Sequence, residues 1–160
     1  MTTIAWDEEI IAWDSLITMG DEKYVHHNTQ KVVSHKGRVF TLCGNAGLLK
    51  KTLIPWWEKG HKADAAPDGD WDMVVIGTDG AFLYSSGSPG AEVSTPSTFA
   101  LGSGSMAARA ALMCGKEPAI AVNIAATLDK STGGPVNWLR LSDHVKKPVM
   151  RKPKRRGARK

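Results

Sequence analysis

The order of the secondary-structure signals constrains the fold of this chain more than any other feature. Short β-rich runs come first, one helical segment follows them, more β-rich runs come next, and two helical segments precede a last strand. A doubly wound parallel sheet would require strands and helices to alternate regularly. We therefore predict an α+β layered fold in which antiparallel sheets are flanked by helices on their outer faces.

Several neighbouring β-rich runs are separated by turn residues, as in β-hairpins. The turns are Asp7-Glu8, His35-Lys36-Gly37 and Thr78-Asp79-Gly80, and each lies between two runs of apolar and β-branched residues. The expected strands are 2–6, 9–13 with an extension over 15–18, 31–33, 38–43, 73–77, 81–84, 93–96, 99–101 and 136–141.

Three segments have helical signals. Residues 48–59 place most of their large apolar side chains on one side, although Pro55 requires a kink or a restart of the helix. Residues 106–114 are rich in alanine and end at Gly115, and residues 118–128 begin with proline at a first-turn position.

The net charge of +5 is unevenly distributed along the chain. Residues 146–160 contain nine of the 21 basic residues and no acidic residue, which leaves residues 1–145 with a net charge of −4. We predict a folded domain over 1–145 and a basic, disordered tail over 146–160, where Pro148, Pro153 and Gly157 oppose a helix. Three roles for this tail stay open: a solvated segment, contact with an acidic partner surface, and nonspecific contact with nucleic acid.

The sequence also bears on the cellular compartment of the protein. Residues 1–20 contain four acidic and no basic residues, unlike a signal peptide, and no apolar run approaches the roughly 20 residues that span a bilayer. We expect a cytoplasmic protein without membrane contact. Cys43 and Cys114 lie among apolar or small residues and are expected to be buried free thiols.

The N-terminus offers a catalytic group. Thr2 has a small side chain, so removal of Met1 would leave a free threonine amine beside its own hydroxyl. One residue then supplies both a nucleophile and a general base. A nearby cation such as Lys31 would disfavour protonation of the amine, and a carboxylate such as Asp14 would orient that cation.

Other candidate residues could complete such a site. The backbone N–H of Gly44, after an apolar strand, could stabilise an oxyanion, and Ser103 and Asp129 could supply a hydroxyl and a carboxylate. Each candidate also has an ordinary structural interpretation: Asp14 as a turn carboxylate, Lys31 as a surface charge, Gly44 as a strand terminator, Ser103 as a helix cap and Asp129 as a loop residue.

Taken together, five ordered blocks resemble the proteasome β-subunit family of N-terminal nucleophile (Ntn) hydrolases, including its HslV-type members. The blocks are residues 2–5; residues 10–15 with Thr18 and Gly20; Gln30-Lys31-Val32; residues 42–47; and the pair formed by residues 100–105 and 129–137. The last pair is the most specific, because Gly-Ser-Gly and Asp-x-x-[Ser/Thr]-Gly-Gly match in order and approximate spacing. The implied fold is an αββα sandwich of two mainly antiparallel sheets flanked by helices. Its helical layer is expected to be reduced on one side, because residues 45–72 have only one clear helix where family members have a longer pair.

The resemblance implies a threonine-type endopeptidase. Thr2 would be the nucleophile, its amine the base and Lys31 the cation that tunes both. The remaining implied roles are Asp14 holding Lys31, Gly44 as oxyanion donor, Ser103, Asp129 and Thr132 completing the network, Thr18 binding the substrate backbone, and Leu42 near the base of a substrate pocket that would favour apolar side chains. Family members need no metal or organic cofactor for this step.

The resemblance also implies partners. Family members enclose their active sites, so homo-oligomeric rings that cleave unfolded polypeptides are expected, with an AAA+ unfolding ATPase as one candidate partner. The chain has no G-x-x-x-x-G-K-[ST] motif, so any use of ATP would belong to that partner. Two alternatives stay open: an Ntn-type amidase acting on a small substrate, and an inactive scaffold that binds an acidic partner through its tail.

Overall fold

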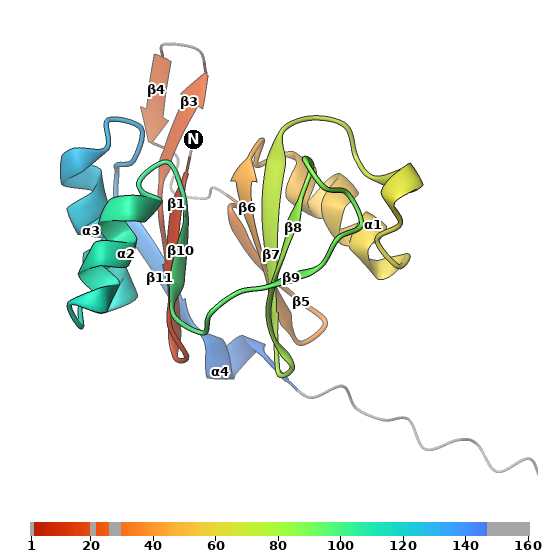
Figure 1. The fold of residues 1–160 in the computed structure, drawn as a ribbon. Helices are drawn as coiled ribbons and strands as arrows, with labels where there is room; N and C mark the ends of the chain where they lie inside the picture. The colour runs from red at the N-terminus through yellow and green to blue at the C-terminus, as the bar shows by residue number, and fades with distance from the viewer. Residues whose placement is uncertain (1, 20–21, 26–29, 147–160) are drawn as a thin grey trace, which may run out of the picture.

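The computed structural model describes residues 2–19, 22–25 and 30–146 (Figure 1). Met1, Gly20 and residues 147–160 lie outside the described residues. The expected removal of Met1 and the basic tail beyond Lys146 therefore also lie outside them. Within the described ranges, no helix is both long and apolar enough to cross a membrane.

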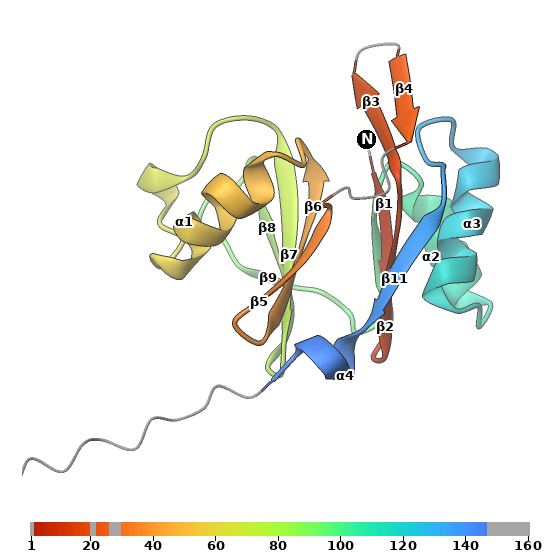
Figure 2. The same cartoon turned by 180° about the vertical axis from the view of Figure 1, so that it is seen from behind.

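Two antiparallel sheets face each other, as Figures 1 and 2 show from opposite sides. The first sheet contains, in spatial order, β10 (Phe99–Gly102), β1 (Thr3–Trp6), β2 (Ile10–Asp14) and β11 (Val136–Arg140). The second contains β5 (Val32–His35), β6 (Arg38–Gly44), β7 (Trp71–Gly77), β8 (Gly80–Ser85) and β9 (Val93–Ser94).

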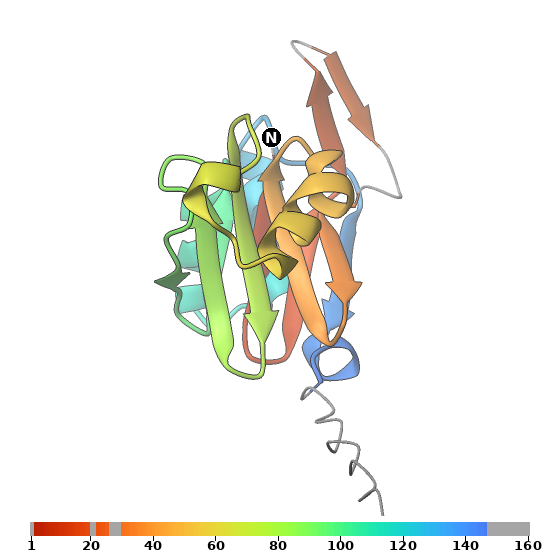
Figure 3. The ribbon, with the colours of Figure 1, turned by 90° about the vertical axis from the view of Figure 1, so that its right-hand side faces the viewer.

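Helices cover the outer face of each sheet unequally. On the first sheet lie two α-helices, α2 (Ser105–Met113) and α3 (Pro118–Leu128); on the second lies a π-helical turn (Leu49–Leu53) that continues into α1 (Ile54–Glu58) (Figure 3). Two short helices, a 3₁₀ turn at Ala63–Ala65 and α4 (Leu141–His144), complete the described chain. This αββα sandwich with one reduced helical layer confirms the predicted fold class.

Strand alternation explains how the layers pack. In β1, Ile4 and Trp6 lie in the cluster between the sheets, together with Val39 and Val74, whereas Ala5 faces the alanines of α2 and α3. Because successive side chains of a strand point to opposite faces, one strand contributes to both clusters. The small Ala5 allows the helices to approach the sheet closely.

The predicted extension at 15–18 forms a separate strand. The backbone N–H groups of Ser15 and Leu16 both donate to the carbonyl of Gly133, at 3.1 and 3.0 Å, where β2 ends and β3 (Leu16–Met19) begins. β3 then pairs with β4 (Glu22–Val25), which the sequence analysis did not predict, and the two strands project beyond the sandwich (Figure 3).

Local expectations and the structure differ at two further points. The helix expected over 48–59 is wound as a π-helical turn before Pro55, which lies in the first turn of α1, where a missing N–H costs no helical hydrogen bond. Lys146, placed in the tail by the sequence analysis, donates its backbone N–H to Gly37 O at 3.0 Å. The three predicted hairpins are confirmed.

Candidate active site

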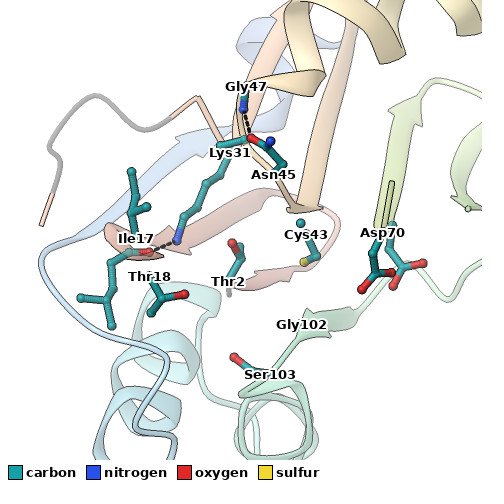
Figure 4. A pocket seen from close by; sticks show the side chains of 14 residues that line it. Thr2, Ile17, Thr18, Lys31, Cys43, Asn45, Gly47, Asp70, Gly102 and Ser103 are labelled. Carbon is teal, nitrogen blue, oxygen red and sulfur yellow. Dashed lines mark hydrogen bonds between the residues drawn. The ribbon is translucent and has the colours of Figure 1, made fainter. Parts of the chain in front are cut away.

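A cavity of about 710 Å³ opens at one end of the sandwich, between the two sheets. Thr2 at the start of β1 lies within it, between side chains from β3 and from the end of β6 (Figure 4). Of the predicted catalytic and substrate-binding residues, five line this one cavity: Thr2, Thr18, Lys31, Gly44 and Ser103. The fold thus brings together five residues that are spread over a hundred positions of the sequence.

Thr2 is held by the end of β10. The N–H of Ser103 donates to the carbonyl of Thr2 at 3.0 Å, and Thr2 is only 3% exposed. The neighbouring Gly102 has φ +99°, and a Cβ atom there would lie 1.7 Å from the Thr2 carbonyl oxygen. Only glycine allows this approach, so the Gly-Ser-Gly motif packs β10 directly against the threonine.

Lys31 and Asp14 form a buried ion pair. Lys31 Nζ lies 2.8 Å from Asp14 Oδ1 and 2.6 Å from the Leu16 carbonyl oxygen. Lys31 is 2% exposed and Asp14 is 1% exposed. Asp14 also accepts backbone N–H groups from Thr3 at 2.9 Å, Leu16 at 3.3 Å and Gly133 at 3.2 Å. The lysine is therefore fixed beside Thr2, and it is not a solvated surface charge.

Burial is the main influence on the pKa of the Lys31 ammonium. Desolvation lowers the pKa of Lys31 below its ordinary value, while the charge and hydrogen bond of Asp14 act in the opposite direction. An ammonium in this position places positive charge beside Thr2, which disfavours protonation of an amine there and stabilises negative charge on a hydroxyl oxygen.

Asp129 and Thr132 are linked to the N-terminal strand through Thr3. The Thr132 hydroxyl donates to Asp129 Oδ2 at 2.6 Å, so in its 2.5 Å contact with Thr3 Oγ1 it is the acceptor. Thr3 Oγ1 in turn accepts the N–H of Gly104 at 2.9 Å. The resulting relay runs in one direction, from Gly104 through Thr3 and Thr132 to Asp129.

Hydrogen bonds also set the ionisation of Asp129. Burial alone would raise the pKa of its carboxyl group, but hydrogen bonds from the hydroxyls of Ser103 and Thr132 and from the Ser131 N–H outweigh it and lower the pKa. Asp129 is thus held as a carboxylate that orients the two hydroxyl groups around Thr2 and Thr3.

Gly44 stands at the end of β6 in a conformation suited to glycine. Its φ is +130°, and a Cβ atom there would lie 2.6 Å from the carbonyl oxygen of Asp70. Any larger residue would push β6 away from the start of β7. Thr18 lines the facing side of the cavity from β3 (Figure 4), and it has an interaction partner in the structure.

Leu42 does not line this cavity. It is fully buried among Leu49, Leu53 and Met73, on the face of β6 that packs against the π-helical turn and α1. Alternation along β6 turns the next residue, Cys43, toward the cavity instead. An apolar preference deduced from Leu42 therefore has no basis in the cavity wall.

Sequence reasoning also missed residues that lie in or beside the cavity. Cys43, Asp70 and Asp72 line it, and Thr3 is fully buried behind it. The second threonine of the Thr-Thr pair was a signal that could have been followed, because a buried hydroxyl needs a partner. Both cysteines are free. Cys114 is exposed, so the expected burial was wrong for that residue, and Cys43 is only half-buried.

Solved structures match this chain over most of its length. BPH from Thiobacillus denitrificans in complex with epoxomicin matches with a TM-score of 0.65 and 19% identity, covering 87% of this chain and 96% of BPH. HslV from Trypanosoma brucei matches with a TM-score of 0.62 and 13% identity, covering 87% of this chain and 97% of HslV.

These matches establish the fold. The chain has the architecture of HslV and BPH, which confirms at the level of the fold the resemblance to the proteasome β-subunit and HslV family. No protein-family model matches the sequence, and no curated protein sequence matches it significantly. At these identities the site must be judged from its own geometry.

Proposed function

We propose that this chain is a threonine peptidase of the proteasome β-subunit and HslV family. The observation that carries the proposal is the convergence of Thr2, the buried Lys31–Asp14 pair, Gly44 and Ser103 at one cavity. The shared fold with HslV and with an epoxomicin-bound BPH supports it.

In the proposed reaction, removal of Met1 frees the Thr2 amine. The amine accepts the proton of the Thr2 hydroxyl while Oγ1 attacks the carbonyl carbon of a peptide bond. The tetrahedral oxyanion is stabilised by the Gly44 N–H. The C–N bond then breaks, the leaving amine takes the proton, and an ester on Thr2 remains. Water hydrolyses this ester, which releases the acid and restores the hydroxyl.

The same proposal includes the assembly of the protein, its location and its partner. Homo-oligomeric rings in the cytoplasm would enclose the cavities and restrict cleavage to unfolded polypeptides. An AAA+ ATPase that delivers substrates is a candidate partner, supported by the likeness to HslV. Size-exclusion chromatography with light scattering measures whether the purified chain assembles.

The deciding experiment is an intact mass of the purified protein before and after exposure to epoxomicin. A peptide epoxyketone bonds to both the hydroxyl and the amine of an N-terminal threonine, so it reports both groups at once. We expect loss of Met1 and one adduct per chain, absent from Thr2→Ala and retained in Thr98→Ala, whose threonine is exposed and outside the cavity.

Other outcomes assign the alternatives. Retention of Met1, or a free Thr2 that forms no adduct in the assembled protein, would contradict the proposal and favour an inactive scaffold. An adduct without cleavage of any unfolded protein or peptide would favour an amidase that acts on a small substrate.

A further inference from the structure

The two walls of the cavity differ in chemistry. On the β3 side the cavity is lined by Leu16 and Ile17, whereas on the other side it is lined by the carboxylates of Asp70 and Asp72. Figure 4 shows Thr2 between Ile17 and Asp70. We call Asp70 and Asp72 the acidic wall. It faces the space where a substrate must lie to reach Thr2.

Strand register explains why this wall faces the cavity. Cys43 in β6 is paired with Asp72 in β7, and opposed residues of an antiparallel pair have side chains on the same face. Trp71 is buried on the opposite face, in the cluster beneath α1. Asp70 immediately precedes β7, and its carbonyl lies against Gly44. Both carboxylates are thus held by the strand that also positions the proposed oxyanion donor.

Among the described residues, no basic side chain neutralises the charge of the acidic wall. Lys31 is the only described basic residue that lines the cavity, and it is paired with Asp14. In the part of the chain that the structure describes, no ion pair involves Asp70 or Asp72. Burial, reinforced by the charge of Asp72, raises the pKa of Cys43 to about 12, so the thiol stays neutral. Within the described part of the chain, two carboxylates without a basic partner therefore lie in the same cavity as the nucleophile.

We propose that the acidic wall binds a lysine or arginine side chain of the polypeptide substrate, close to the bond that Thr2 attacks. The inference rests on the proposed peptidase function and names its substrate preference. A basic side chain would supply the countercharge that the cavity lacks, and an acidic side chain would be repelled. The apolar preference expected from Leu42 is replaced by a basic one.

The size of the preference for a basic side chain follows from the solvent exposure of the two carboxylates. Asp70 is exposed and Asp72 is half-buried, so each ion pair with substrate is partly screened by water. An exposed ion pair contributes only a small free energy of interaction. This corresponds to about a fivefold preference in kcat/KM for arginine over its neutral analogue citrulline. Salt weakens interactions of this kind, so the preference should shrink in about 1 M sodium chloride.

The experiment uses pairs of fluorogenic peptides that differ only in arginine or citrulline at one position. The exchanged position is varied over the two residues on each side of the cleaved bond. We expect the wild-type assembly to favour arginine about fivefold at one or more positions. The ratio should fall to about one in the double variant D70N/D72N, which retains the shape of both side chains but not their charge.

A matched control is available two residues upstream. Asp68 is also exposed but does not line the cavity, so D68N should retain the arginine preference. Equal rates for arginine and citrulline peptides in wild type, or a preference that persists in D70N/D72N, would overturn the proposal. Absence of an epoxomicin adduct would instead indicate failure of the peptidase function, so the two failures are distinguishable.

Discussion

Two hydrogen-bonded clusters hold the Thr2-Thr3 segment, and they differ in charge and in burial. The buried ion pair (Asp14 and Lys31) is at most 2% exposed and brings two full charges out of water. The hydroxyl relay (Thr3, Thr132 and Asp129) consists mainly of neutral groups and ends at a half-buried carboxylate. The first cluster supplies charge beside the nucleophile, and the second fixes the direction of hydroxyl groups.

Because of this difference, substitutions in the two clusters should have different effects. Removal of one member of a buried pair leaves an uncompensated charge, which strongly destabilises the folded state. Removal of one hydroxyl leaves unpaired neutral groups, at a smaller cost. Variants of the two clusters can therefore separate stability from activity.

The largest effect is expected for Asp14→Ala. Lys31 would keep only the Leu16 carbonyl as a partner, and Thr3, Leu16 and Gly133 would each lose an acceptor for their N–H. The free energy of unfolding should fall by about 3–5 kcal/mol, measured by urea denaturation. Lys31→Met should cost less, because Asp14 would retain three backbone donors, yet it should still abolish the epoxomicin adduct.

A surface ion pair provides the control for this prediction. Arg38 and Asp79 are bonded at 2.7 Å, but Asp79 is 53% exposed. Asp79→Ala should change the free energy of unfolding by no more than about 1 kcal/mol. Equal costs for Asp14→Ala and Asp79→Ala would contradict the importance assigned to burial.

A smaller effect is expected for Thr3→Val, which preserves the shape of the side chain but interrupts the hydroxyl relay. The N–H of Gly104 would lose its acceptor and the Thr132 oxygen its donor, at a cost of about 1–3 kcal/mol. The rate of epoxomicin adduct formation should also fall in Thr3→Val. Thr3→Ser retains the oxygen and should restore that rate; a slow Ser variant would show that packing, not hydrogen bonding, is the role of Thr3.

Asp129→Asn should have a weaker effect on stability, of about 1 kcal/mol or less, because the residue is only half-buried. The pKa of Asp129 is lowered in the folded protein, so its ionised form favours folding. That contribution is present above the unfolded pKa of about 4 and is lost as the pH falls through the folded value. Unfolding measured between pH 3 and 7 should therefore depend less on pH in Asp129→Asn than in wild type.

The last prediction compares the reactivity of the two cysteines in the wild-type protein and needs no substitution. Burial raises the pKa of Cys43 to about 12 even though the charge of Lys31 acts to lower it. At pH 8 the Cys43 thiol should be protonated and react slowly with iodoacetamide, whereas the exposed Cys114 should react first. Intact mass should show one rapid modification; two equally rapid modifications would mean that the surroundings of Lys31 are open to water.

Local sequence signals predicted much of the fold. The turn residues of three hairpins and the first-turn proline of α3 act over a few positions, and the structure has these elements where they were expected. The strand β4 was missed because its four residues are all exposed, so no alternation of apolar and polar residues identifies it. The π-helical turn was missed because its winding depends on how Leu49 and Leu53 fit the core.

The candidate site was predictable only in part. Thr2, Lys31, Gly44 and Ser103 could be singled out by type and order, and the structure places all four at one cavity. Asp70 and Asp72 carry no local signal of a role. Their position depends on the register between β6 and β7, a pairing of segments nearly thirty residues apart.

Which residues of a strand share a face follows from the order of residues, because alternation is a property of the extended backbone. In β6 this alternation groups Phe40 with Leu42 and Val39 with Cys43. The side that each pair faces is set by the folded molecule: the first pair faces α1, and the second faces the opposite sheet. That choice depends on the packing of whole layers, and it is the reason that Leu42 lies in the core while Cys43 and the acidic wall lie beside Thr2.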